Sequence, residues 1–201
     1  MLSSEEMKAF LKARLSKKRY NHSVNVAHEA KKLAAYLGED TRKAYTAGLL
    51  HDVCKEILPA EQKQMMLEGN MELSPAELSA RALWHGPAGA YFIEKEMGIR
   101  DRDIINAVRF HTVGRSGMSP LEEIVYMADL ISEDRDYKDI DKMRKLAYTD
   151  FQMAMLEAFA FSIESVIKKQ GYIPKYTLDA YNQYLYVCSV QKKAKEENDG
   201  K

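Results

Sequence analysis

The chain has 201 residues, enough for one domain with a substantial core and short for two. Hydrophobic residues make up 46% of it and charged residues 30%, which are ordinary values for a globular protein. The 30 basic and 30 acidic residues give a formal net charge of zero, which excludes a strongly basic protein that binds nucleic acid or anionic membranes non-specifically. We therefore expect no nucleic-acid and no membrane partner, and any anion must be bound by local basic groups.

The start of the chain and its cysteines predict a cytoplasmic protein. No stretch approaches the roughly 18 consecutive apolar residues that a membrane span requires. Glu5 and Glu6 lie near the start, and no long apolar region follows them, which argues against a signal peptide. Cys54 and Cys188 are the only cysteines, and we expect two free thiols rather than a disulfide.

Helical periodicity begins near the start of the chain. Ser3 followed by Glu6 is the signature of a capping box, so a first helix is predicted there. A second helix is predicted from about Tyr20 to Leu37, with Gly38 as its C-cap. Thr41 is predicted to cap a third helix.

Cap residues also mark the later helices. Ser74-Pro75 and Ser119-Pro120 each place a cap before a proline at the first helical position. Gly86-Pro87 is predicted to break the chain. Asp150 is predicted to begin a long apolar helix, and Thr177 to cap the last one.

No segment has the alternation of a β-strand, and no internal repeat is visible. We therefore predict an all-α fold with a single domain over residues 1–190 and a polar, disordered tail over residues 191–201. The last helix, with its tyrosines, can either cover the core or form the contact of a homodimer. Its pattern does not decide between the two.

An adjacent histidine and aspartate end an apolar helix in the segment AYTAGLLHD. Neighbouring residues of a helix diverge by roughly 100°, so His51 and Asp52 can face one site only where the helix ends at a polar pocket. The apolar stripe stops at His51, and the basic Lys55 follows. The pattern is consistent with such a helix end.

Asp129 lies in an otherwise apolar segment, EEIVYMADLISEDR. A carboxylate on a buried helix face costs several kcal/mol unless it is paired or binds a metal. We interpret Asp129 as a metal ligand. The alternatives are a position on the wet edge of the helix and a pair with an arginine.

Of the remaining histidines, His22, His85 and His111 are candidate site residues, and His28 is not. His22 lies near the start of the second predicted helix, and His28 is six residues further, about 240° around the helix axis. One helix cannot aim both at the same metal, so His28 is assigned to the surface or the core. His85 and His111 each lie at a predicted helix boundary. Histidine nitrogens and carboxylate oxygens together suit iron, manganese, cobalt, nickel or zinc.

The ordered set of histidines and aspartates resembles the H…HD…D motif of the HD superfamily of phosphohydrolases. Five blocks, RYNHSVNVA, AGLLHDVCKE, ALWHGPAGA, FHTVGRSGM and YMADLISEDRD, resemble in order those of the YqeK family, over residues 19–190. The resemblance implies the helical HD-domain fold. It also implies symmetrical hydrolysis of diadenosine tetraphosphate and related dinucleoside polyphosphates, with ADP or GDP as product.

The same resemblance implies a role for individual residues. His22, His51, Asp52 and Asp129 match its metal ligands, and iron is the metal that it suggests, with manganese, cobalt or nickel as alternatives. Asp52 would also position the attacking water or share its proton. The positions that would handle the nucleotide and its phosphates are Arg19, Lys55, His85, His111, Thr112 and Arg135.

Two of these positions carry several interpretations. His85 and His111 can protonate the leaving oxygen, stabilise phosphate charge or complete a second metal site, and we favour contact with the phosphates. One departure from the family concerns the loop ISEDR, where a Glu-Pro-like pair is expected before Arg135. Arg135 itself is present.

Other readings remain open at this stage. Arg19, Lys55 and Arg135 can each be an ordinary solvated residue, and Arg135 can form a surface ion pair. Trp84 is assigned to the core or a pocket wall rather than to base stacking. Within enzymes, the alternative function is a nucleoside monophosphate or deoxynucleoside triphosphate phosphohydrolase. Outside them, it is a nucleotide-binding regulatory module without catalysis.

Overall fold

The computed structural model describes residues 3–199, and these form eleven α-helices and one short 3-10 turn, with no β-strand among them. The elements in chain order are α1 (Ser4–Arg14), α2 (Lys17–Leu37), α3 (Thr41–Leu50), α4 (Pro59–Glu68), α5 (Pro75–Ser79), η1 (Arg81–Leu83), α6 (His85–Lys95), α7 (Arg102–Phe110), α8 (Pro120–Ile131), α9 (Ile140–Ala147), α10 (Phe151–Lys168) and α11 (Lys175–Asp199). The all-α prediction is confirmed.

Most helices begin where their predicted caps lie. Ser3, Ser74 and Ser119 each form a complete capping box, in which the serine and a glutamate three residues later satisfy each other's backbone N–H groups. Asp150 caps α10 by accepting a hydrogen bond from the backbone N–H of Met153. These starts were predictable because a cap depends only on residues within one turn.

Two predicted starts were wrong by a few residues. Helix α2 begins at Lys17 rather than near Tyr20, because the hydroxyl of Ser16 caps it. The cap of α3 is Asp40 and not Thr41, since the Asp40 carboxylate accepts hydrogen bonds from the two following backbone N–H groups that need a partner.

Two further predictions were wrong for reasons of hydrogen bonding. The Gly86-Pro87 pair does not break the chain but lies in the first turn of α6, which begins at His85. A proline is tolerated there because the first N–H groups of a helix have no partner within it. Thr177 does not cap α11, which begins at Lys175; its hydroxyl instead donates to the carbonyl of Val113, at 2.7 Å.

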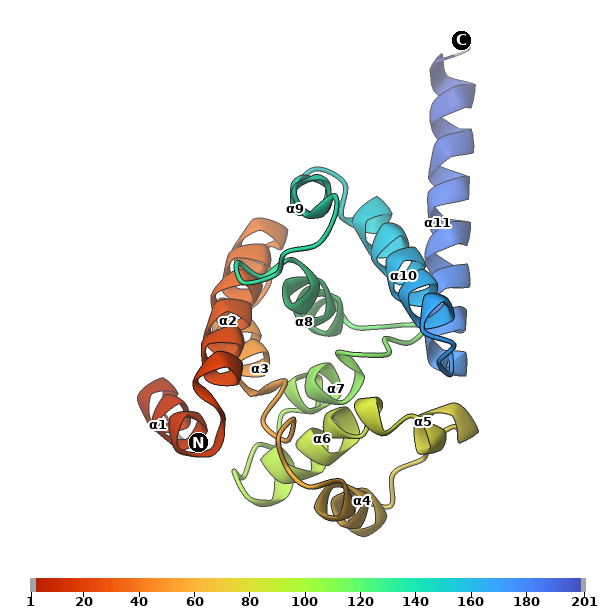
Figure 1. Cartoon of the computed structure of the whole chain (residues 1–201). Helices are drawn as coiled ribbons and strands as arrows, with labels where there is room; N and C mark the ends of the chain where they lie inside the picture. Colours follow the sequence, from red (N-terminus) through yellow and green to blue (C-terminus); the bar gives the residue numbers. More distant parts are fainter. Residues whose placement is uncertain (1–2, 200–201) are drawn as a thin grey trace.

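Helix α8 lies at the centre of the molecule (Figure 1). It packs against α2, α3, α7, α9 and α10. Ile124, Val125, Met127 and Ala128 are fully buried on it. Any polar side chain near its C-terminal end therefore lies between several helices.

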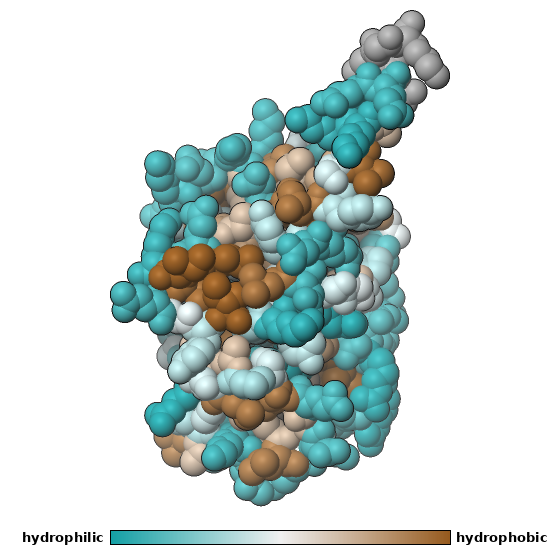
Figure 2. Space-filling view, turned by 90° about the vertical axis from the view of Figure 1, so that its right-hand side faces the viewer, coloured by the Kyte–Doolittle hydropathy of each residue, from teal (hydrophilic) through white to brown (hydrophobic). Residues whose placement is uncertain are grey.

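Helices α10 and α11 pack against each other on one side of the molecule, and α11 projects beyond the body (Figure 1). Tyr184 and Ala180 are buried on α11, so this helix covers the core. Figure 2, which looks at this side, shows apolar patches among hydrophilic residues. The helix continues to Asp199 and so includes most of the predicted polar tail, whose residues 200–201 lie outside the described part.

The cysteines and the apolar character of the helices can be read directly from the described residues. Cys54 and Cys188 are buried and free of a disulfide, as predicted. No helix within residues 3–199 combines the length and the apolar character that crossing a membrane requires.

Candidate metal centre

The end of α3 directs His51 into the interior. His51 is the C-cap residue that directly follows this helix and is fully buried, and its Nδ1 atom lies 2.6 Å from the carbonyl of Gly48. A Cβ at Gly48 would meet the Cα of Ala27 at 3.0 Å, so the glycine allows α2 and α3 to approach closely. This approach brings the rings of His22 and His51 to 5.2 Å between centroids.

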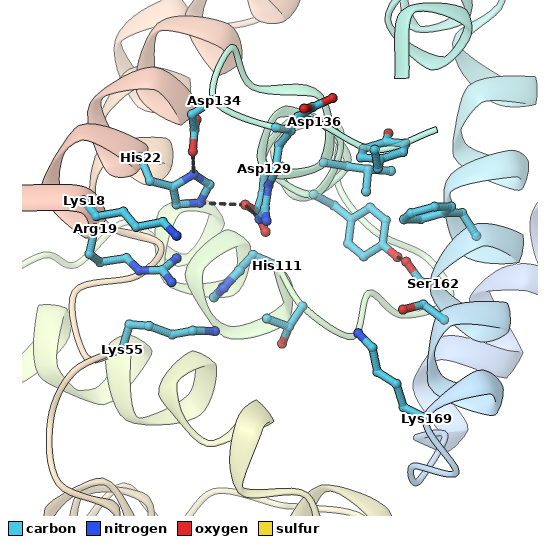
Figure 3. Close-up of a pocket in the computed structure, with 17 residues that line it drawn as sticks. Lys18, Arg19, His22, Lys55, His111, Asp129, Asp134, Asp136, Ser162 and Lys169 are labelled. Atoms are coloured by element: carbon cyan, nitrogen blue, oxygen red, sulfur yellow. Dashed lines mark hydrogen bonds and ion pairs between the residues drawn. The ribbon is translucent and has the colours of Figure 1, made fainter. Parts of the chain in front are cut away.

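Three of the predicted ligands converge from three helices. Nε2 of His22 lies 2.9 Å from Oδ1 of Asp129, and Nε2 of His51 lies 3.8 Å from the same oxygen. These atoms lie within 4.8 Å of one another, a spacing that can hold one metal ion. Figure 3 shows His22 and Asp129 facing each other across the site.

Hydrogen bonds on the far side of each imidazole select one tautomer. Nδ1 of His22 lies 2.8 Å from Oδ2 of Asp134, and Nδ1 of His111 lies 2.8 Å from the carbonyl of Val108. Nδ1 of His51 makes the same kind of contact with the carbonyl of Gly48. In all three histidines the proton therefore lies on Nδ1. Nε2 is then free to accept a metal, which is the arrangement that orients histidine ligands in metalloproteins.

Several buried polar atoms at the centre have no hydrogen bond. They are Nε2 of His22, Nε2 of His51 and Oδ1 of Asp52. The 2.9 Å contact of His22 with Asp129 is an ion-pair distance that lacks the geometry of a hydrogen bond. Because buried polar atoms are costly without a partner, this donor set fits a divalent metal.

A second group of ligand atoms shares His51 with the first. His51, Asp52 and His111 also lie close enough to hold a metal. Nε2 of His85 lies 3.2 Å from Oδ1 of Asp52 and 3.0 Å from Nε2 of His111. The structure therefore brings together the four residues of the motif, His22, His51, Asp52 and Asp129, with His85 and His111 beside them.

The protonation behaviour of the centre follows from burial and neighbouring charges. Burial raises the pKa of Asp129, but His22, His51 and Arg135 outweigh it and hold that pKa well below its usual range. Burial lowers the pKa of His85 to about 4, assisted by His111. At neutral pH the carboxylate is therefore charged and His85 is neutral.

Three partly exposed basic side chains contact residues of this centre. Nη1 of Arg19 lies 2.6 Å from Oδ2 of Asp52, and Nζ of Lys55 lies 3.1 Å from Nε2 of His85. Arg135 forms an ion pair of 2.5 Å with Asp129. Arg19 and Lys55 are thus not free surface residues, whereas Arg135 forms the ion pair with Asp129 that was the alternative for both residues, and its side chain is 39% exposed.

A cavity of about 670 Å³ opens beside the centre (Figure 3). The residues that line it are Lys18, Arg19, His22, Lys55, His111, Thr112, Tyr126, Asp129, Leu130, Asp134, Arg135, Asp136, Tyr137, Phe161, Ser162, Ser165 and Lys169. All the predicted phosphate-handling residues are among them except His85, which lies buried behind the others. The hydroxyl of Thr112 is buried without a partner and is free for a ligand.

Sequence reasoning missed several residues of this site. Asp134 orients His22, yet in the sequence it is one of several acidic residues of a loop. Phe161 and Ser162 come from α10 and Lys169 is the C-cap that follows it, and Figure 3 shows Ser162 and Lys169 on the wall opposite His22. No signal in the sequence pointed to this wall, because Phe161 stands among other apolar residues of the helix and its exposure is decided by packing.

His28 lies outside the site, as predicted, and of the two positions considered for Trp84, the core and a pocket wall, the structure shows the core. His28 is exposed and its ring packs edge-on against Tyr45, away from the centre. Trp84 is half-buried and donates a hydrogen bond from Nε1 to the carbonyl of Glu77. Neither lines the cavity.

The fold and the centre define a helical protein with a buried histidine–aspartate cluster of the HD type that could hold a divalent metal. The chain belongs to the HD domain family, whose profile matches residues 19–144. It is 37% identical over 183 residues to the symmetrical bis(5'-nucleosyl)-tetraphosphatase of Bacillus subtilis strain 168, an alignment that covers 90% of this chain and 97% of that protein. The protein of the same description from Staphylococcus aureus strain NCTC 8325 is 34% identical, over 92% of this chain and 96% of its own.

A solved structure agrees with this assignment. The crystal structure of a Clostridium acetobutylicum protein, described as a predicted HD superfamily hydrolase involved in NAD metabolism, superimposes with a TM-score of 0.89. Its sequence is 38% identical, and the match covers 92% of this chain and 98% of that one. The HD fold and family predicted from the sequence are thereby confirmed.

Proposed function

We propose that this protein is a metal-dependent hydrolase that cleaves diadenosine tetraphosphate and related dinucleoside polyphosphates symmetrically, giving two ADP from the adenosine substrate. The observation that carries the proposal is the position of three cations, Arg19, Lys55 and Arg135, around the unpaired ligand atoms of a buried metal centre. Cations so placed suit a polyphosphate chain. The two relatives that align over at least 90% of this chain carry the same activity in their names.

The metal would be held by His22, His51, Asp52 and Asp129. Iron is our proposed metal, with manganese, cobalt and nickel as the alternatives that the same ligands accept. When bound, a divalent cation supplies Lewis acidity and makes hydroxide available near neutral pH.

The protein's own residues would orient the reaction. Asp52 lies between Arg19 and His51, at 2.6 and 3.4 Å, so its carboxylate is positioned to hold the proton of an attacking water. Lys55 and Arg19 would neutralise charge on the phosphates as it develops on the leaving oxygen. Burial lowers the pKa of Lys55, which leaves it a better proton donor than an exposed lysine.

For His85 and His111, the spacing favours one of the three earlier alternatives. His111 groups with His51 and Asp52 at metal-binding spacing, and His85 lies behind them without lining the cavity. We infer that these residues complete a second metal position instead of contacting the phosphates directly. Metal stoichiometry tests this, since two ions per chain support it and one ion contradicts it.

The outer wall of the cavity would hold the nucleoside. The rings of Tyr137 and Phe161 pack together with centroids 4.6 Å apart, and both line the cavity. Aromatic faces of this kind stack with nucleobases regardless of base identity. Ser162, Ser165 and Lys169 lie on the same wall and offer polar contacts for the sugar and phosphate.

Product analysis on the purified protein tests the proposal. Diadenosine tetraphosphate, nucleoside monophosphates and deoxynucleoside triphosphates would each be incubated with the iron- or manganese-loaded protein. ADP as the sole product supports symmetrical cleavage, whereas free phosphate or nucleoside from mononucleotides identifies the alternative enzyme. Binding of ADP without any turnover identifies a regulatory module.

The cellular location and the oligomeric state are further proposals. We place the enzyme in the cytoplasm, because its two buried cysteines are free thiols. We also propose a homodimer through the exposed apolar residues of α11, which include Leu178, Leu185 and Val190. Light scattering would give twice the 23.0 kDa chain mass if the dimer forms.

A further inference from the structure

Arg144 lies on α9, outside the cavity, and its guanidinium donates hydrogen bonds to several backbone carbonyls. Nε donates to the carbonyl of Ile131 at 3.1 Å, and Nη2 donates to those of Ser132 at 2.9 Å and Arg135 at 3.1 Å. A longer contact of 3.5 Å reaches the carbonyl of Glu133. The side chain of Arg144 thus restrains the backbone from the end of α8 to Arg135.

This segment begins where α8 ends. The last carbonyls of a helix have no partner within it, and a cation placed there is favourable. Arg144 supplies both the donors and the charge from the following helix. The side chain of Arg144 is one-third exposed, so the contacts and not burial define its position.

The side chains of the tied segment contact two proposed metal ligands. Asp134 accepts hydrogen bonds from Ser132 and Asn25, at 3.0 and 3.2 Å, and its other oxygen lies 2.8 Å from Nδ1 of His22. Arg135 donates from Nε to the carbonyl of Asp129 at 2.8 Å and pairs with its carboxylate. Figure 3 shows Asp134, His22 and Asp129 in one connected line.

We propose that Arg144 is a positioning residue for the metal centre, acting through Asp134 on His22. The inference rests on the metal site of the proposed function and adds a residue that touches neither metal nor substrate. Without Arg144 the segment is free to move, Asp134 no longer holds the imidazole, and the ligand set is less well arranged before the metal binds. Loss of such an outer partner lowers metal affinity about 10- to 100-fold.

A competing explanation is that Arg144 merely stabilises the end of α8. That role would lower the free energy of unfolding and leave the metal affinity of the folded protein unchanged. The two explanations therefore differ in the dissociation constant for a metal, measured well below the unfolding temperature.

The experiment measures Mn²⁺ binding to the metal-free, folded protein by competition with a chelating dye. The variants are Arg144→Met, which removes every donor, Arg144→Lys, which keeps the charge, and Asp134→Asn. Asp141→Asn is the matched control, because the Asp141 carboxylate is 92% exposed and contacts Arg144 without touching the segment. Urea unfolding of each metal-free variant is measured alongside.

We expect Arg144→Met to raise the dissociation constant about 10-fold, Arg144→Lys to raise it less, and the control to leave it unchanged. The double variant with Asp134→Asn should bind no more weakly than Asp134→Asn alone, because both act on one path. Unchanged affinity in Arg144→Met and Arg144→Lys overturns the proposal, as does full additivity in the double variant. If Arg144→Met does not fold, Arg144→Lys and its double variant decide.

The same measurement separates this inference from the proposed function. A wild-type protein that fails to bind Mn²⁺ refutes the metal centre itself. A wild-type protein that binds Mn²⁺ with an affinity that Arg144 does not affect refutes only the positioning role. At saturating Mn²⁺, kcat of Arg144→Met should return to the wild-type value, since Arg144 contacts no reacting atom.

Discussion

Nε2 of His22 lies 2.9 Å from Oδ1 of Asp129, so that the start of α2 and the end of α8 meet at one point. Each side chain has a second contact: Nδ1 of His22 lies 2.8 Å from Asp134, and the same Oδ1 of Asp129 accepts a hydrogen bond from Nη2 of Arg135. The ligand atoms are therefore arranged before any metal arrives. Preorganisation of this kind reduces the cost of binding.

Substitution of Asp129 should remove metal and activity together. Asp129→Ala takes away a charged ligand and leaves Arg135 facing two histidines. We expect at least a 100-fold weaker affinity for Mn²⁺ and a comparable loss of hydrolysis, more than for loss of an outer partner. Metal content and product release are measured on the same preparation. A metal-replete, active variant would exclude Asp129 as a ligand.

Substitution of His28 should leave the reaction intact. The residue is exposed and contacts Tyr45 instead of the centre. His28→Ala is expected to keep kcat and metal content within about twofold of wild type, as for surface changes in general. His22→Ala, on the same helix, is the paired variant and should lose both. A collapse of activity in His28→Ala would contradict the helical geometry.

Truncation of Phe161 should weaken nucleotide binding without affecting the metal. Stacking of a base on an aromatic ring contributes about 1–3 kcal/mol, so Phe161→Ala should raise KM for diadenosine tetraphosphate roughly tenfold. The metal content should not change. Tyr172→Ala serves as control, because this tyrosine is exposed and does not line the cavity. Equal KM values for the two variants would refute the stacking surface.

A buried ion pair beneath the site should dominate local stability. Nη2 of Arg109 lies 2.7 Å from Oε1 of Glu77, and both side chains are buried. We expect Glu77→Ala to lower the free energy of unfolding by about 3–5 kcal/mol, because it leaves a buried cation unpaired, and by about 1 kcal/mol more, because it removes the capping box with Ser74. Glu164→Ala, which breaks an exposed pair with Lys168, should cost less than about 1 kcal/mol in the same urea titration.

His85 should make the metal-free protein less stable in mild acid. Burial lowers its pKa to about 4 from an ordinary value of 6.5, so between these values the unfolded chain binds the proton and the folded chain does not. The free energy of unfolding therefore falls as the pH drops through this window, by up to about 3 kcal/mol from this group. Urea titrations from pH 6.5 to 4.5 should show a flatter dependence for His85→Gln. An identical slope would contradict the assignment.

Local patterns in the sequence determined most of the helices. Ser74, Ser119 and Asp150 cap the helices that follow them because a cap needs only residues within one turn. Where a second residue nearby could also cap the helix, the predicted start was wrong by one residue or more, as for Asp40, which caps α3 in place of Thr41. Hydrogen bonds between neighbours decided these cases.

The proposed ligands could also be recognised in the sequence. A polar group on an apolar helix face is costly to bury unless it is paired or binds a metal. Asp129 and the His51-Asp52 pair stand out for this reason, and their metal-binding role stays a prediction until metal is measured. Only the tertiary structure decided what surrounds them. Asp134 and Arg144 are ordinary charged residues until the segment after α8 folds back on α2 and α9.

The composition and motifs of this chain determined its helical class, its family and the residues that meet at the centre. Packing alone decided that α10 forms the far wall of the cavity and that the segment after α8 orients His22. The physical reason is distance. Periodicity and capping act within a few residues, whereas the contact between Asp134 and His22 joins segments brought together by burial of α8.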